Sequence, residues 1–82
     1  MKQVNERLMR LMEERQLDVD SLRSRLEEAG HGYSREHFRR VLSGRRTLTQ
    51  RTFRVVVEAL EVDNEVQRDL CGLYVYSSLE ES

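Results

Sequence analysis

Apolar residues recur along this chain at intervals of three or four, the period that places them on one face of an α-helix. Strict alternation of apolar and polar residues, which marks a half-buried strand, does not extend over a useful length. The pattern predicts five helices and no sheet, at about residues 3–15, 18–29, 34–43, 49–61 and 64–76. The apolar stripes supply an expected core, made of Leu8, Leu11, Leu22, Leu26, Phe38, Val41, Phe53, Val56, Leu60 and Leu70.

Three of the predicted helices begin with the same local signal. A side chain that can accept a hydrogen bond from a free backbone N–H stands at the start, with apolar residues just before it and four residues after it. These capping residues are Asp18, Ser34 and Thr49. Either Asp63 or Asn64 can cap the fifth helix. Gly30 and Gly44 follow the second and third helices, where a left-handed backbone commonly ends a helix.

The length of 82 residues suits one domain with one modest core. We expect a helical domain over residues 1–76 and a short C-terminal tail over residues 77–82. So small a core leaves little room for an enzyme cleft, and neither a nucleophile–base pair nor a glycine-rich phosphate loop is visible. The single cysteine and two scattered histidines lack a metal-binding spacing. The sequence therefore favours a protein that is not an enzyme and that needs no metal or cofactor.

The distribution of charge and apolar residues also bears on location. Charged residues recur through residues 1–16, so no signal peptide is visible there. No apolar run approaches the roughly 20 residues that cross a bilayer. We therefore expect a soluble, cytoplasmic protein that does not bind membranes, and nothing in the pattern indicates a small-molecule substrate.

The formal net charge of −1 conceals an uneven distribution. Residues 34–57 hold seven arginines and one acid, a net charge of +6, while the rest of the chain holds seven basic and fourteen acidic residues, a net charge of −7. Isolated exposed arginines are usually only solvated, but so dense a basic segment is typical of a nucleic-acid-binding surface. The middle of the chain is therefore the candidate binding region.

Residues 34–62 resemble the recognition-helix segment of the lambda-repressor-like (Cro/C1-type, XRE) DNA-binding family. Ser34 opens the helix, Phe38 and Val41 form its apolar pair, Gly44 ends it, and basic residues follow. The next helix begins at a threonine cap and ends in Ala-Leu-Glu-Val at 59–62. The resemblance extends over roughly residues 4–74 and implies a five-helix domain with a helix-turn-helix at about residues 18–43. It also implies sequence-specific DNA binding and transcription regulation, as in a repressor.

In this family the third helix enters the major groove of double-stranded DNA. The base-reading positions of the family correspond to Arg35, Glu36 and Arg39, and we expect Arg40, which faces outward on the same helix, to read bases as well. The phosphate-binding positions of the family correspond to Ser43, Arg45, Arg46 and Thr49, and we add Ser34 and Arg51 as candidate phosphate contacts. Arginine can bond guanine at two points, and glutamate can accept from the cytosine amino group. Glu36 also lies four residues before Arg40, so it is equally suited to an ion pair along the helix.

Two features depart from the family pattern. Arg23 stands where the family usually has alanine, and the distance from Asp18 to Ser34 is longer than usual. Val19 and Asp20, at the start of the second helix, are poor phosphate contacts. These departures, together with the acidic remainder of the chain, leave an alternative function open. It is a protein-interaction module that keeps the helical scaffold without binding DNA.

The fifth predicted helix is apolar on two sides. The side expected to face the core holds Val66, Leu70, Leu73 and Tyr74. The opposite side holds Cys71, Val75 and Leu79. Because a monomer has no use for a second apolar stripe, we expect a two-fold homodimer that places two recognition helices one DNA turn apart. A short exposed patch near the end of a helix is the simpler alternative.

Overall fold

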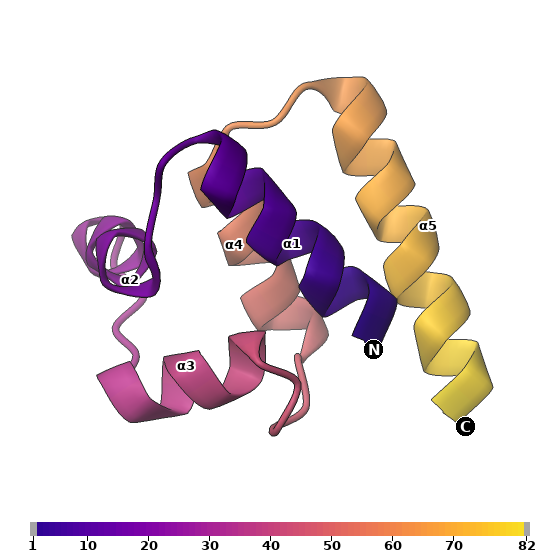
Figure 1. Cartoon of the computed structure of the whole chain (residues 1–82), viewed down its shortest axis with the longest axis horizontal. Coiled ribbons are helices and arrows are strands. Elements are labelled where there is room, and N and C mark those ends of the chain that lie inside the picture. Colours follow the sequence, from indigo (N-terminus) through magenta and orange to yellow (C-terminus); the bar gives the residue numbers. More distant parts are fainter. Residues whose placement is uncertain (1, 82) are drawn as a thin grey trace.

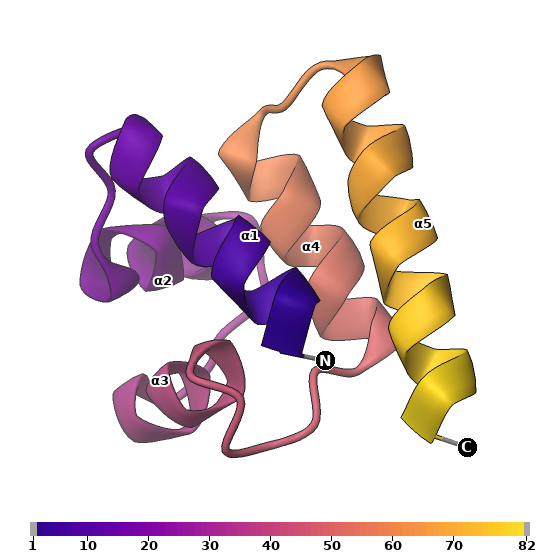
Figure 2. The ribbon, with the colours of Figure 1, turned by 45° about the vertical axis from the view of Figure 1, so that its right-hand side comes forward.

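The computed structural model describes residues 2–81 and contains no strand in that range. Its five helices are α1 (Lys2–Glu14), α2 (Val19–Glu28), α3 (Arg35–Leu42), α4 (Gln50–Leu60) and α5 (Asn64–Glu81). α1 packs against α3 and α5, and α2 packs against α3 and α4 (Figure 1). Figure 2 shows α5 at one edge of the molecule beside α4, on the opposite side from α2. The expected all-helical class is confirmed, and the first four helices lie within one residue of their predicted bounds.

The predicted capping residues explain why the helices begin where the sequence predicted. Each side chain accepts from the backbone N–H three residues later, at 2.7 Å for Asp18 and at 3.2 Å for Ser34 and for Thr49. At the start of α5, Asp63 rather than Asn64 accepts, at 2.9 Å. An N-cap of this kind typically contributes about 1 kcal/mol, so local chemistry fixes where these helices begin.

The connection between α2 and α3 is closed by a left-handed glycine. Gly30 has a φ of 91°, its N–H donates to Glu27 O at 3.0 Å, and the N–H of His31 donates to Leu26 O at 2.8 Å. These two bonds satisfy carbonyl groups that the end of a helix leaves unpaired. The longer connection seen in the sequence is thus a ten-residue α2 with an ordered end, followed by the short link to Ser34.

The end of α4 was not predicted from a local signal. Glu61 adopts a left-handed backbone with a φ of 52° although it is not glycine. Two arginines from outside α4 bond its last carbonyl groups: Nε of Arg15, just after α1, lies 2.8 Å from Leu60 O, and Nη1 of Arg25 on α2 lies 3.3 Å from Ala59 O. Positive charge at this end of a helix is favourable because of the helix dipole. These contacts join α1 and α2 to α4.

The core contains all ten of the predicted residues, which confirms the apolar stripes. It also contains six further apolar residues: Val4, Met12, Leu42, Leu48, Val55 and Val57. The rings of Phe53 and Tyr74 stack with centroids 4.6 Å apart, and the Tyr74 hydroxyl donates to Leu48 O at 2.8 Å. These contacts join α5 to α4, and the side of α5 expected to face the core does so.

α5 corrects the expected C-terminal tail. The helix was predicted to end near residue 76, but it continues to Glu81, so residues 77–81 are helical. Ser77 is only 5 % exposed, and neither glycine nor proline follows Gly72 to stop the helix. The helix therefore extends by more than a turn beyond its predicted end. Ser82 lies outside the described residues.

Candidate nucleic-acid interface

α3 is held firmly at its start. Tyr33 stacks on Phe38 with ring centroids 5.8 Å apart, which is the predicted contact across the Ser34 cap. The Tyr33 hydroxyl also lies 3.2 Å from Thr52 Oγ1, on the first turn of α4. This hydroxyl and the Thr49 cap share Thr52 as a partner. The start of α3 is thereby tied to the start of α4.

The outer side of α3 carries the base-reading positions that the sequence indicated. Phe38, Val41 and Leu42 are buried, which turns the rest of the helix outward. Its exposed residues include all four candidates, Arg35, Glu36, Arg39 and Arg40. We call the exposed residues Arg35, Arg39, Arg40, Arg45 and Arg46, on α3 and the loop after it, the arginine face.

Two arginines of this face are already paired. Arg40 forms an ion pair with Glu36 one turn earlier, which is one of the two roles considered for that acid. Arg35 Nη2 lies 3.0 Å from Asp20 Oδ2 on the first turn of α2. Among residues 2–81, Arg39 makes no ion pair or hydrogen bond through its side chain. Arg39 is therefore the arginine of α3 whose donors are most available.

The loop after α3 is ordered by its backbone. Gly44 has a φ of 86°, its N–H donates to Val41 O at 3.3 Å, and the N–H of Arg45 donates to Arg40 O at 2.9 Å. A Cβ on Gly44 would also lie 3.0 Å from Asn5 Nδ2 of α1. Glycine is needed here both for its backbone and for this close approach. The turn sets Arg45 and Arg46 directly beside the end of α3.

The remaining candidates divide between this loop and α4. Ser43 is exposed, and its hydroxyl donates to Arg40 O at 3.1 Å, while Arg46 Nη1 lies 3.4 Å from His37 Nδ1. Ser34 and Thr49 are both exposed but are used as caps, so each offers only its remaining hydrogen-bonding capacity. Arg51 and Arg54 line a shallow groove on α4 together with Glu58. No residue of the arginine face lines this groove.

The start of α2 is acidic. Asp18 is exposed, and its pKa is lowered because its carboxylate accepts from the backbone and side chain of Ser21, with smaller contributions from the Asp20 backbone and the charge of Arg35. Asp20 follows in the same turn. Both carboxylates lie where free N–H groups of a helix would otherwise attract an anion. The sequence marked Asp20 as a poor phosphate contact, but its pairing with Arg35 links positions 15 residues apart and carries no local signal.

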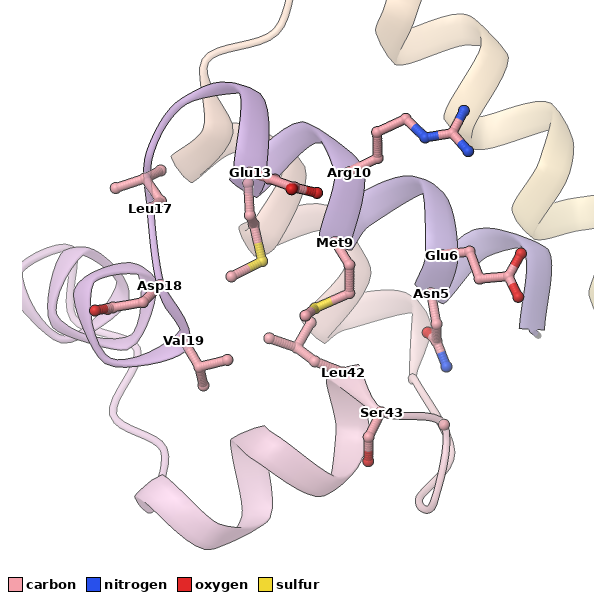
Figure 3. A pocket seen from close by; sticks show the side chains of 12 residues that line it. Asn5, Glu6, Met9, Arg10, Glu13, Leu17, Asp18, Val19, Leu42 and Ser43 are labelled. Carbon is pink, nitrogen blue, oxygen red and sulfur yellow. The ribbon is translucent and has the colours of Figure 1, made fainter.

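A separate groove of about 980 Å³ lies between α1, the start of α2 and the end of α3. Figure 3 shows Met9, Val19 and Leu42 pointing toward one another across this groove. Met9 is 43 % exposed, and the buried Asn5 has an Oδ1 atom without a hydrogen-bond partner in the described chain. Sequence reasoning missed this surface because Met9 sits beside the apolar stripe of α1 rather than on it.

The outer side of α5 carries the expected second stripe, Cys71, Val75 and Leu79, which we call the α5 stripe. All three residues are exposed, Val75 by 58 % and Leu79 by 70 %. Tyr76, which the sequence did not single out, is also 58 % exposed next to the stripe. Cys71 and Val75 border a groove of about 330 Å³ that α4 lines on its other side. The predicted dimer surface is therefore available, and its use stays a prediction.

Other kinds of site receive no support from the described residues. Within residues 2–81, no three His, Cys, Asp or Glu side chains are grouped so that they could hold a metal ion. None of the helices described combines the length and the apolar character that a membrane span requires. The chain matches no protein-family model, no curated protein and no solved structure.

Proposed function

We propose that this chain is a lambda-repressor-like helix-turn-helix protein that binds double-stranded DNA in a sequence-specific manner and regulates transcription, as a repressor does. The observation that carries the proposal is the arginine face: five exposed arginines on one short helix and its following loop. Packing of α3 against α1 and α2 supports the proposal, because a recognition helix needs a fixed scaffold to read base edges.

In this proposal α3 lies in the major groove and its arginines have different tasks. Arg39 has unpaired donors and is the leading candidate to bond a guanine at two points. Arg35 is paired with Asp20, and Arg40 is paired with Glu36. Each arginine reaches a base edge either with its ion pair intact or after the ion pair has broken. A side chain that must first break an ion pair contributes less net binding free energy, so Arg39 is expected to contribute most.

The loop after α3 supplies the phosphate contacts. Its turn directs two arginine side chains and the Ser43 hydroxyl away from the core, and all three are exposed. Arg45 and Arg46 neutralise phosphates without reading sequence, because phosphates are present at every step of a duplex. Ser34 and Thr49 add hydroxyl contacts at the starts of α3 and α4. Arg51, exposed on the first turn of α4, adds a further phosphate contact.

A two-fold dimer through the α5 stripe is part of this proposal. Exposed leucine and valine on one side of a regular helix are stabilised when a partner covers them. A second copy brings a second α3, and two such helices about 34 Å apart match successive major grooves on one side of a duplex. The binding site on DNA is then expected to be an inverted repeat.

The groove beside Met9 favours a second candidate function, a protein-interaction module without DNA binding. Its apolar side chains and the unpartnered amide oxygen of Asn5 suit a segment of another protein better than a phosphate. Substitution of Met9 by serine distinguishes the two functions, because it removes apolar surface from the groove without adding charge beside Ser43. DNA binding by α3 predicts unchanged duplex affinity for this variant.

Titration of a labelled random-sequence duplex with the protein at two salt concentrations tests the proposed function. The affinity should fall steeply with salt, and Arg45→Ala should lower the slope of log affinity against log salt by about one. Arg10→Ala is the matched control, because it removes an exposed arginine on α1 and should leave the slope unchanged. Weak binding that does not depend on salt would contradict the proposal.

A further inference from the structure

Asp20 lies at the start of α2 and its carboxylate contacts the first turn of α3. It lies on the first turn of α2, and its Oδ2 atom is 3.0 Å from Arg35 Nη2 on the first turn of α3. The side chains are 47 % and 64 % exposed, so the pair stands on the surface rather than in the core. Its other oxygen, Oδ1, is buried and accepts no hydrogen bond from the described residues. One oxygen of the carboxylate is therefore enclosed by the protein, and the other contacts Arg35.

This arrangement restricts what Arg35 can do. A free arginine side chain samples many rotamers and binds any phosphate within reach. A guanidinium carries five N–H donors, and the contact with Asp20 Oδ2 uses one nitrogen, which leaves donors for another acceptor. Asp20 therefore limits the directions in which Arg35 points without exhausting its donors.

The same carboxylate discriminates between the two kinds of acceptor on DNA. A phosphate carries a full negative charge, whereas guanine O6 and N7 carry only partial charges. An acceptor that approaches Arg35 comes close to Asp20 as well, and Asp18 adds a second negative charge at this helix start. Coulomb repulsion is then much larger for a phosphate than for a base edge. The pair favours base contacts over backbone contacts.

On the basis of the proposed function, we propose that Asp20 is a positioning residue that sets DNA specificity, by holding Arg35 toward base edges and repelling phosphates from the start of α2. The residue thereby lowers affinity for random DNA more than affinity for the preferred site. An acid at this position lowers the overall affinity for DNA, but it improves discrimination between the preferred site and random DNA.

The test compares Asp20→Asn with the unmodified protein on two duplexes, the preferred site selected from a random pool and a scrambled sequence. We expect affinity for the scrambled duplex to rise by about tenfold, because one nearby negative charge is lost. Affinity for the preferred site should rise less, so the ratio of the two affinities falls. Glu28→Gln is the matched control, because it removes the same charge from the far end of α2.

Two further variants separate positioning from a general effect on the fold. Asp20→Glu keeps the charge and should restore most of the affinity ratio. In an Arg35→Ala background, Asp20→Asn should change the ratio much less, because the guanidinium that it orients is gone. Thermal unfolding of each variant shows whether the fold is intact, and the ratio is a readout that a purely structural role would not move.

Failure of this inference is distinguishable from failure of the proposed function. If the unmodified protein binds no duplex in a salt-dependent way, both are wrong. If it selects a preferred site and Asp20→Asn changes both affinities by the same factor, as Glu28→Gln does, then the proposed function stands and the role of Asp20 is wrong.

Discussion

The arginine face and the α5 stripe are both exposed, but their side chains differ in how favourably water solvates them. Arginine side chains are well solvated, and two of those on α3 also pair with neighbouring carboxylates, so this face is stable without a partner. The valine and leucine of the α5 stripe gain nothing from water and are better covered. The comparison shows that a charged surface is stable in water without its ligand, whereas an exposed apolar surface favours permanent association with a partner.

The largest expected effect is on the free energy of unfolding, when one large side chain is removed from the core that supports both surfaces. Phe53 is 3 % exposed on α4 and stacks on Tyr74 of α5. Phe53→Ala should lower the free energy of unfolding by about 3–5 kcal/mol, because it leaves a cavity between these helices. Urea denaturation measures this change, with Arg68→Ala as a surface control. A loss below about 1 kcal/mol would mean that the two surfaces do not depend on this packing.

The next effect separates two kinds of arginine within the arginine face. Arg39→Ala should cost about 1–3 kcal/mol of binding free energy on the preferred site and relax the preference at one base pair. Arg45→Ala should weaken binding to preferred and scrambled duplexes alike. Binding titrations of both variants on both duplexes decide the matter. Equal losses on every duplex for Arg39→Ala would assign it to the phosphates.

Charged side chains on the α5 stripe should prevent dimerisation. The double variant Val75→Glu, Leu79→Glu places two carboxylates on the stripe, and their desolvation in an interface is unfavourable. The unmodified protein should be a dimer by light scattering at high micromolar concentration, and the double variant should be a monomer with the same helical content. A monomer before mutation would show that the stripe is a short exposed patch and nothing more.

The smallest effect concerns the Asp18 cap. Hydrogen bonds from Ser21 lower the pKa of Asp18 below its ordinary value of 3.8, so the carboxylate stabilises the folded state above that value. This contribution is lost as the pH falls through the lowered pKa of the folded protein. As the pH falls below 3.8, the Asp18→Asn variant should therefore lose less stability than the unmodified protein. Thermal unfolding at several pH values measures this difference. Glu28→Gln serves as the control, and an unchanged pH profile for Asp18→Asn would contradict the role of this cap.

Local signals in the sequence were sufficient to predict the all-helical class, most helix boundaries and most of the buried residues. Asp18, Ser34 and Thr49 cap their helices because each bond spans only three residues. Gly30 and Gly44 adopt the left-handed backbone that their positions required. The apolar stripes predicted the buried residues because the helical period alone determines which side chains share a face.

Contacts between distant parts of the chain could not be predicted in this way. Arg15 reaches the end of α4 across 45 residues, and the Arg35 pair with Asp20 depends on how α2 crosses α3. The apolar pattern did not predict the extension of α5 to Glu81, and the buried residue of that extension, Ser77, is polar. The candidate site was therefore predicted as a set of exposed residues, while the pairing that distinguishes Arg39 from Arg35 and Arg40 required the structure.

The most direct test of the arginine face is an NMR titration of isotope-labelled protein with a duplex that contains the selected site. Amide resonances of residues 34–46 should shift most, with smaller changes at the start of α4, and resonances of Glu6, Met9 and Glu13 on α1 should remain in place. Shifts that cluster around Met9 or on α5, or no shifts on α3, would contradict the claim that α3 and its loop bind DNA.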